Sequence, residues 1–234
     1  MIMPDVRMPP EAKVAGSRQS VFLVEDDLMV GQLFANHIAR SRRFLLAGIG
    51  PTLVSSISAM EQSRPDLVLL DVNMPDGDGI NFLPRFRTAS PSSRFFVCTA
   101  RNDEALVFRA MQSDLNGLIH KPDISTPESF IETLTVMVSH DRYISKGMAK
   151  AAEALRCHNS FSKLLSNREL ELLPYFGRDY SDAVIGAKFS ISPETVHSHR
   201  RKVMFKLDLH TASALVAWCV RYGFVDRRSF DVDL

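Results

Sequence analysis

The sequence predicts two domains of different class: an α/β domain with a parallel sheet, followed by a smaller all-helical domain. Up to about residue 140, short apolar runs alternate with helical patterns, whereas after about residue 160 only helical patterns occur. Residues 19–140 also hold 10 Lys and Arg against 14 Asp and Glu, while residues 161–228 hold 11 against 7. An acidic first part and a basic second part indicate different partners, the second of them a polyanion.

The chain of 234 residues divides into five parts on these patterns. We predict a flexible N-terminal tail over residues 1–18, the α/β domain over 19–140, a linker over 141–160, the helical domain over 161–228 and a C-terminal tail over 229–234. The linker is polar and rich in Ala, so we expect it to be partly helical.

Five apolar runs are the predicted strands of the first domain, because such runs are typical of parallel strands covered on both faces. They occupy residues 21–24, 44–47, 67–70, 95–98 and 118–119. Helices are predicted over residues 28–40, 52–63, 78–89, 103–115 and 126–139. The arrangement is therefore (βα)5, with helices on both faces of the sheet, and Ser125 or Thr126 caps the last helix.

The second domain shows four helical segments, over residues 167–176, 181–188, 193–206 and 211–222. Ser181 or Asp182 suits the cap of the second segment. Ser192 suits the cap of the third, and Pro193 suits its first position. Pro174 falls late in the first segment, where we expect it to shorten or kink the helix.

Composition excludes several classes of protein. The hydrophobic fraction of 45% and the charged fraction of 24% are those of a soluble globular chain. No apolar run approaches the roughly 20 residues of a membrane helix, and the start lacks a secretory pattern. Cys98, Cys157 and Cys219 are far apart and lack metal-ligand spacing. We therefore predict a cytoplasmic protein without a membrane partner.

Chemically distinctive residues follow four of the predicted strands. Glu25, Asp26 and Asp27 follow the first strand, Asp71 the third, Thr99 the fourth, and Lys121 with Pro122 the fifth. The carboxyl ends of parallel strands meet at one edge of the sheet, where ligands bind. Converging carboxylates stay ionised only beside a cation, and their oxygens favour Mg²⁺. A single Asp at a strand end is usually a turn or cap residue, but four such strand ends together indicate a site.

A carboxylate at this position can act as a nucleophile and form an aspartyl-phosphate. The Thr99 hydroxyl can donate to a phosphoryl oxygen, and Lys121 can supply a positive charge from the other side. The sequence therefore predicts a phosphoryl-accepting site with Asp71 at its centre.

These residues resemble the receiver domain of two-component response regulators. The resemblance covers residues 19–140, including the stretch DLVLLDVNMPDGDG at 66–79. It implies a flavodoxin-like sheet of order 2-1-3-4-5, an arrangement that is general for this fold. It also implies phosphorylation of Asp71 by a sensor histidine kinase. Mg²⁺ is then bound by Asp26, Asp71, the backbone carbonyl of Asn73 and, through water, Glu25, while Thr99 and Lys121 contact the phosphoryl group.

Two further expectations follow from the receiver resemblance. The Lys121–Pro122 bond is cis in most such domains, which only an X-Pro bond tolerates easily. The family usually has Tyr or Phe three residues before the Lys, but this chain has Leu118. Because Leu cannot reproduce the inward swing of an aromatic ring, we expect switching to be weak or to use another route.

The second domain contains a pair of helices with a short turn between them, and the second helix is basic. No acid occurs between Thr195 and Leu207. Spacing places Val196, His199, Val203 and Leu207 near one inward face. A basic helical face is often only solvated, but a short turn before it is the geometry of the helix-turn-helix.

The region 160–225 resembles the LuxR-type DNA-binding domain of NarL/FixJ regulators, an all-α four-helix fold. The resemblance rests on Ser166-Asn167-Arg168-Glu169, Leu172-Leu173, Ser192, Thr195-Val196, His199, Val203 and Lys206-Leu207. It implies that helix 193–206 enters the major groove of double-stranded promoter DNA, with His197, Ser198 and Arg201 facing bases. Thr195, Arg200 and Lys202 are then expected to contact phosphates. If four cations of this helix touch phosphate, the salt slope is about −3 to −4 per monomer.

The sequence hypothesis is a transcriptional response regulator that dimerises and binds promoters when Asp71 is phosphorylated, with the last helix, including Leu215 and Trp218, as a possible dimer interface. A first alternative keeps this fold but makes DNA binding independent of phosphorylation or dependent on another ligand; Leu118 is its only motive. An enzyme is the second alternative. It is disfavoured, because a haloacid-type phosphatase needs Asp where Asn73 stands and no Walker A loop occurs. We therefore predict no enzyme and no catalytic residue.

Overall fold

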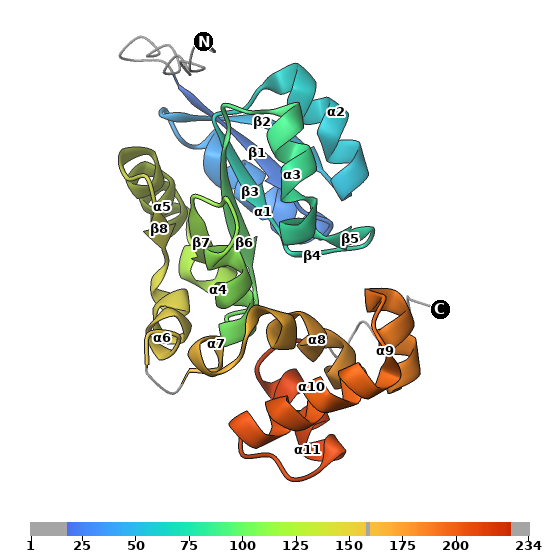
Figure 1. Ribbon diagram of the computed structural model, residues 1–234. Coiled ribbons are helices and arrows are strands. Elements are labelled where there is room, and N and C mark those ends of the chain that lie inside the picture. The colour runs from blue at the N-terminus through green and yellow to red at the C-terminus, as the bar shows by residue number, and fades with distance from the viewer. Residues whose placement is uncertain (1–17, 158–159, 226–234) are drawn as a thin grey trace, which may run out of the picture. The chain divides into compact units, whose positions relative to one another are not determined.

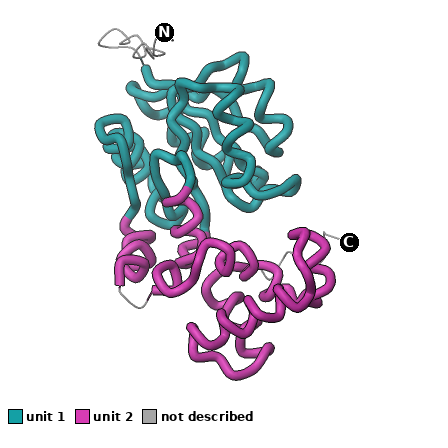
Figure 2. The backbone as a smooth tube through the Cα atoms, viewed as in Figure 1, with its two compact units in different colours: residues 1–100, 113–145 teal, residues 101–112, 146–234 magenta. Residues whose placement is uncertain are grey.

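A computed structural model describes residues 18–157 and 160–225 (Figure 1). The predicted C-terminal tail and all but the last residue of the predicted N-terminal tail lie outside these ranges. The chain forms two compact units (Figure 2), unit 1 with residues 1–100 and 113–145 and unit 2 with residues 101–112 and 146–234.

Unit 1 is built on a six-stranded parallel sheet. Its strands are β1 (Gln19–Val24), β2 (Phe44–Gly50), β3 (Leu67–Leu70), β6 (Arg94–Thr99), β7 (Gly117–His120) and β8 (Tyr143–Ile144). The order is β2-β1-β3-β6-β7-β8. Its first five strands confirm the order 2-1-3-4-5 that the receiver resemblance implies. The sixth, β8, was not predicted and lies in the stretch interpreted as linker.

The helices of unit 1 begin where the sequence places capping residues. They are α1 (Leu28–Ala39), α2 (Leu53–Ser63), α3 (Gly79–Ala89) and α5 (Pro127–Ser139). Their N-caps are Asp27, Thr52, Asp78 and Thr126, whose side chains accept from backbone N–H groups of the first turn. Thr126, not Ser125, thus caps α5. A short 3-10 helix, η1 (Lys121–Ile124), and a hairpin of β4 (Asn73–Met74) with β5 (Gly77–Asp78) complete the unit.

Alternate residues of β1 enter the two sides of the sheet. Val21 and Leu23 belong to a buried cluster that includes Phe34 of α1 and Phe130 of α5, whose rings stack 4.9 Å apart. The period of two residues in a strand therefore directs the buried Phe22 to the opposite face. Both faces of the sheet are covered, which explains why the strands read as unbroken apolar runs.

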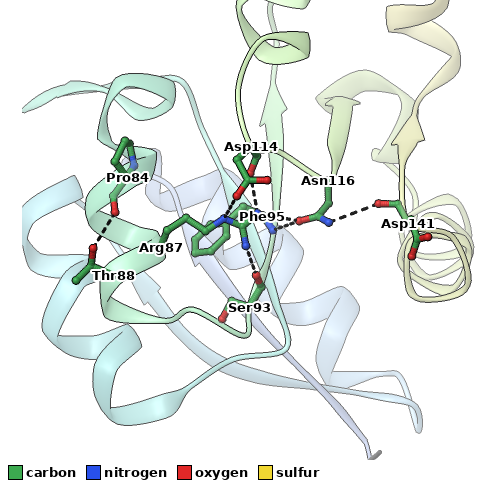
Figure 3. A network of polar contacts seen from close by, with 8 residues as sticks. All are labelled: Pro84, Arg87, Thr88, Ser93, Phe95, Asp114, Asn116 and Asp141. Atoms are coloured by element: carbon green, nitrogen blue, oxygen red, sulfur yellow. Dashed lines mark hydrogen bonds and ion pairs between the residues drawn. The ribbon is translucent and has the colours of Figure 1, made fainter. Parts of the chain in front are cut away.

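A polar network fixes the amino ends of the central strands (Figure 3). Arg87 of α3 donates to the backbone oxygens of Ser93 and Asp114, each at 2.7 Å, and its guanidinium lies over the ring of Phe95. The side-chain oxygen of Asn116 accepts from the backbone N–H of Phe95 at 2.9 Å. The network thereby ties α3 to the starts of β6 and β7.

The added strand β8 is held against β7 by specific features of the chain. Tyr143 donates its backbone N–H to the backbone oxygen of Asn116 at 3.0 Å. A Cβ atom at Gly117 would collide with the backbone of Tyr143, so the close approach of β8 requires glycine here. At the other end, Ser145 donates its N–H to the oxygen of Leu118 at 2.9 Å.

Unit 2 is helical in the part of the chain that the structure describes. Its helices are α4 (Glu104–Met111), α6 (Lys146–Ala154), α7 (Phe161–Leu164), α8 (Asn167–Gly177), α9 (Asp182–Phe189), α10 (Pro193–Lys206) and α11 (Ala212–Arg221). The all-α second domain is therefore confirmed. Among the described residues, no helix combines the length and apolar character needed to cross a bilayer.

Helix α4 packs within unit 2 although it falls between β6 and β7 in the chain. Ala105 donates its N–H to the oxygen of Tyr222 at 3.1 Å, and Arg101 donates to the oxygen of Gly223 at 2.7 Å. The Phe108 and Phe161 rings meet edge to face, with centroids 5.7 Å apart. The compact units are therefore not contiguous in sequence, and the domain boundaries given above stay a prediction.

Candidate functional site

The four strand ends singled out in the sequence meet at one edge of the unit 1 sheet. One carboxylate oxygen each from Glu25, Asp26 and Asp71 lies within 4.8 Å of the others. Glu25 and Asp71 are buried, whereas Asp26 is exposed. The cluster therefore combines two desolvated acids with one that solvent reaches.

Lys121 lies between the two buried acids. Its Nζ is 2.6 Å from Asp71 Oδ2 and 2.6 Å from Glu25 Oε2. Burial alone lowers the pKa of Lys121, but the charge of Asp71 and the hydrogen bonds to both acids outweigh it and raise that pKa to about 12. The lysine is thus firmly cationic at neutral pH.

Burial raises the pKa of Glu25 above its usual value, with a contribution from the negative charge of Asp71, although Lys121 opposes both. The site contains three carboxylates and one ammonium group, so it holds two negative charges in excess when all are ionised. Oxygen ligands with this surplus fit a divalent hard cation such as Mg²⁺. Glu25, Asp26 and Asp71 could hold such a cation.

The loop after β3 supports the cluster. Asn73 donates its backbone N–H to Asp71 Oδ1 at 3.3 Å. Asp76 accepts from the N–H groups of Leu53 and Val54 at the start of α2, both at 2.9 Å. Asp76 therefore anchors the loop on α2, whereas Asp71 belongs to the acid cluster.

Thr99 is the buried last residue of β6, and Lys121 directly follows the neighbouring strand β7. The expectation of a cis Lys121–Pro122 bond is wrong, because the bond is trans. Lys121 opens η1 with Pro122 in its first turn, a position where a trans proline fits without strain. The lysine reaches Asp71 in this geometry. Leu118 is a buried residue of β7.

In unit 2, α9 and α10 form a tight helix-turn-helix. Ser190 adopts a left-handed conformation that ends α9, and Ser192 caps α10 by accepting from the N–H of Thr195 at 3.2 Å. A Cβ atom at Gly186 would lie 2.7 Å from the oxygen of Ile191. Glycine therefore permits the close turn.

The exposed face of α10 carries most of the residues predicted to contact DNA. Thr195, His197, Ser198, Arg201 and Lys202 are exposed. On the opposite side Val196 and Val203 are buried, as their spacing predicts, while His199 and Leu207 are partly buried. The helix thus presents a polar, cationic face.

Known proteins show the same two modules. Residues 21–135 match the response regulator receiver domain, and residues 163–219 match the bacterial regulatory proteins of the luxR family. The oxygen regulatory protein NreC of Staphylococcus carnosus is 26% identical over 185 residues, which are 74% of this chain and 83% of that protein. NreC of Staphylococcus haemolyticus is 25% identical over 178 residues, covering 70% and 80%.

This chain is a response regulator of the NarL/FixJ family. It is a DNA-binding transcriptional regulator. RcsB from Salmonella enterica serovar Typhimurium, in a structure with promoter DNA and a phosphomimetic, matches with a TM-score of 0.62 and 19% identity over 88% of this chain and 100% of that one. That likeness shows the shared fold.

One predicted DNA contact of this response regulator is engaged inside unit 2. The Arg200 side chain is 13% exposed, donates to Asp182 Oδ1 at 2.8 Å and to the Tyr180 oxygen at 2.9 Å, and lies over the ring of Phe176. These contacts orient α10 on α9. His197 also has Nδ1 3.2 Å from Asp182 Oδ2, but its side chain is 61% exposed.

Sequence reasoning missed the role of Asp182. Ser181 takes the N-cap of α9, so the Asp182 carboxylate is directed to α10 instead. It also missed Phe205, which is 87% exposed on α10 one turn after Arg201. The spacing of four residues from Arg201 was the available signal. Leu215, named for the dimer interface, is buried within unit 2, and Trp218 stacks on Tyr222 with centroids 4.3 Å apart.

Proposed function

We propose that this regulator is controlled by phosphorylation of Asp71, which a histidine kinase performs, and that phosphorylation promotes dimerisation and promoter binding. The observation that carries the proposal is the cluster of Glu25, Asp26 and Asp71, of which Glu25 and Asp71 pair with Lys121, in a chain that also bears the helix-turn-helix. A cytoplasmic location and a role other than that of an enzyme are part of the same proposal.

The site has the groups that the acceptor step needs. An oxygen of Asp71 attacks the phosphorus of a phosphohistidine, the P–N bond breaks, and the leaving imidazole takes up a proton. Mg²⁺ held by Asp26, Asp71 and the Asn73 carbonyl, with Glu25 acting through water, would neutralise charge on the incoming group. Lys121, already 2.6 Å from Asp71 Oδ2, is placed to follow the new phosphoryl oxygens. Thr99 ends the neighbouring strand and supplies a hydroxyl donor.

On the DNA side, we assign base contacts to His197, Ser198 and Arg201 and phosphate contacts to Thr195 and Lys202, since all five are exposed on α10. Arg200 acts instead by holding α10 against Asp182. Lys206 is also paired, with Glu169 Oε2 at 2.6 Å. Because Lys202 is then the single cation of α10 assigned to a phosphate, the expected salt slope falls to about −1 per monomer.

The test is a comparison of wild type and Asp71→Asn with acetyl phosphate and Mg²⁺. The DNA probe is a duplex selected from a random library by the phosphodonor-treated wild type. We expect the donor to drive dimerisation, seen by analytical ultracentrifugation, and tighter binding in wild type alone. Asp27→Asn is the matched control, because it removes a neighbouring acid while Asn still caps α1.

The alternative is DNA binding without control by phosphorylation. One observation supports it: Leu118 stands where the family usually has an aromatic residue. It predicts that wild type and Asp71→Asn bind the duplex equally with and without the donor. That result, together with an unphosphorylated Asp71 by mass spectrometry, would overturn the proposed function and leave only the DNA-binding role.

A further inference from the structure

One residue, His120 of β7, contacts the chain at two of the places where it leaves unit 1. The chain passes from unit 1 into unit 2 after Ala100 and again after Ser145. His120 Nε2 lies 3.2 Å from the Ala100 oxygen, and the His120 backbone N–H donates to Ser145 Oγ at 2.9 Å. The last residues of unit 1 at both crossings are therefore bonded to the same residue.

The geometry sets the chemistry of both bonds. A carbonyl oxygen only accepts, so the Nε2 atom that faces Ala100 must carry the proton. Ser145 is buried, accepts from His120 and donates its own N–H to the Leu118 oxygen. The pair of bonds locks Ser145 to the end of β7, directly before α6 begins at Lys146.

His120 is also a direct neighbour of Thr99 and Lys121, the two residues expected to move on phosphorylation. It precedes Lys121 in the chain, and it is the register partner of Thr99, whose next residue is Ala100. A displacement of Thr99 or Lys121 toward a phosphoryl group on Asp71 must therefore shift one end of the His120–Ala100 bond.

We propose that His120 is the positioning residue that couples the phosphoacceptor site to the segments leaving unit 1, in place of an aromatic at position 118. The proposal rests on the proposed function, because it needs a phosphoryl group at Asp71. Residues 118 and 120 share one face of β7, since side chains alternate along a strand. The Leu118 side chain is buried and cannot donate a hydrogen bond. The His120 imidazole, in contrast, makes a directional hydrogen bond to the loop after Thr99.

A purely structural role explains the contact less well. The His120–Ala100 bond is exposed to solvent, and such a bond adds little net stability because water replaces it readily. The register of β8 is already fixed by Gly117, Asn116 and the Ser145 N–H. What the imidazole adds is a link between the loop at Ala100 and the strand that leads to α6.

The experiment uses the full chain and three variants. His120→Leu removes the donor. His120→Gln restores an N–H donor at a similar reach from the backbone. His140→Leu is the matched control, because the His140 ring contact, from Nδ1 to the Val136 oxygen at 3.0 Å, lies at the end of α5 and involves neither Ala100 nor Ser145. Each protein is tested for Asp71 phosphorylation by acetyl phosphate with Mg²⁺, and for affinity to the selected duplex before and after phosphorylation.

In wild type we expect phosphorylation to tighten DNA binding by about 5- to 150-fold, the usual range of coupling between two sites. His120→Leu should accept the phosphoryl group as readily as wild type and retain a cooperative thermal transition, yet lose most of the tightening. His120→Gln should recover it, and His140→Leu should behave as wild type. A structural defect alone would lower phosphorylation and stability together and would not separate Gln from Leu.

Two failures are distinguishable. If His120→Leu tightens on DNA as strongly as wild type, or if His120→Gln fails to recover the response, the coupling role is wrong while the phosphoacceptor function stands. If wild type itself accepts no phosphoryl group at Asp71, the proposed function fails, and the coupling that rests on it fails with it.

Discussion

Two buried glutamates in this molecule each pair with a lysine at the same distance, yet their pKa values shift in opposite directions. Lys121 Nζ lies 2.6 Å from Glu25 in unit 1, and Lys206 Nζ lies 2.6 Å from Glu169 in unit 2. The Glu25 and Glu169 side chains are 5% and 3% exposed. Nevertheless the pKa of Glu25 is raised, whereas the pKa of Glu169 is lowered.

The neighbours of each pair explain the difference. Burial raises the pKa of both acids. At Glu169 the hydrogen bond from Lys206 and the donors of Ser166, whose backbone N–H is 2.7 Å away in a capping box, outweigh it. At Glu25 the lysine is shared with Asp71, whose negative charge adds to the effect of burial. The charge of Glu169 is compensated by its own partners, so this pair stabilises the fold. Glu25 and Asp71 share one lysine, so negative charge remains there for a cation to neutralise.

The largest effect should follow removal of the shared lysine. In Lys121→Met without divalent cation, Glu25 and Asp71 stay buried without a positive partner, and we expect unit 1 to lose about 3–5 kcal/mol. Hydrogen exchange of the β3 amides measures this loss. Mg²⁺ should restore part of it, since a ligand that binds only the folded state stabilises it. An unchanged exchange rate in chelator would contradict the charge-crowding argument.

Removal of the other lysine should cost less. In Lys206→Met the two Ser166 donors still hold Glu169, and we expect a loss of about 1–2 kcal/mol from unit 2. Trp218 is the only tryptophan of the chain and lies in unit 2, so urea unfolding followed by its fluorescence isolates this unit. Lys202→Met, which removes an exposed lysine of the same helix, is the control and should change stability by less than about 0.5 kcal/mol. Equal losses in the two variants would show that the Glu169 pair is not special.

The sequence predicted the acid cluster well because the pattern is local at each strand end and the parallel sheet brings the ends together. Asp71 and Lys121 are 50 residues apart in the chain, yet both follow a buried strand, and Lys121 Nζ indeed reaches Asp71 Oδ2. The strand order, by contrast, was predicted from the resemblance to the receiver domain. The exposed positions of α10 followed from helical periodicity.

What the sequence did not predict depends on contacts between distant segments. Strand β8 has only two residues and is held by Asn116 and Gly117, so no run of apolar residues predicts it. The capture of Arg200 by Asp182 depends on which of two adjacent residues caps α9. Helix α4 packs in unit 2 through Phe108 and the carbonyls of the chain after α11, contacts that no periodicity encodes.

Acid should separate the two pairs further. The folded-state pKa of Glu169 is below the ordinary 4.5, so its stabilisation is present above that value and is lost as the pH falls through the folded-state pKa. The folded-state pKa of Glu25 is raised, so the ionised Glu25 destabilises unit 1. This destabilisation disappears as the pH falls through the folded-state pKa and Glu25 is protonated. Urea midpoints at Trp218 for wild type and Glu169→Gln, taken from about pH 6 to about pH 3, should converge in acid. A constant difference between them would mean that the charge of Glu169 contributes nothing.

The smallest effect on stability, and the sharpest test of the comparison, is expected for Glu25→Gln. The substitution removes the charge that burial and Asp71 disfavour, and Lys121 keeps its partner in Asp71. Unit 1 should therefore stay within about 1 kcal/mol of wild type or become more stable. Its affinity for Mg²⁺, measured by calorimetric titration, should nevertheless fall by about 10- to 100-fold, because Glu25 orients the ligands around the cation. If the same substitution destabilised unit 1 and left Mg²⁺ binding unchanged, Glu25 would be a structural partner of Lys121, as Glu169 is of Lys206, and the surplus of negative charge would not belong to the site.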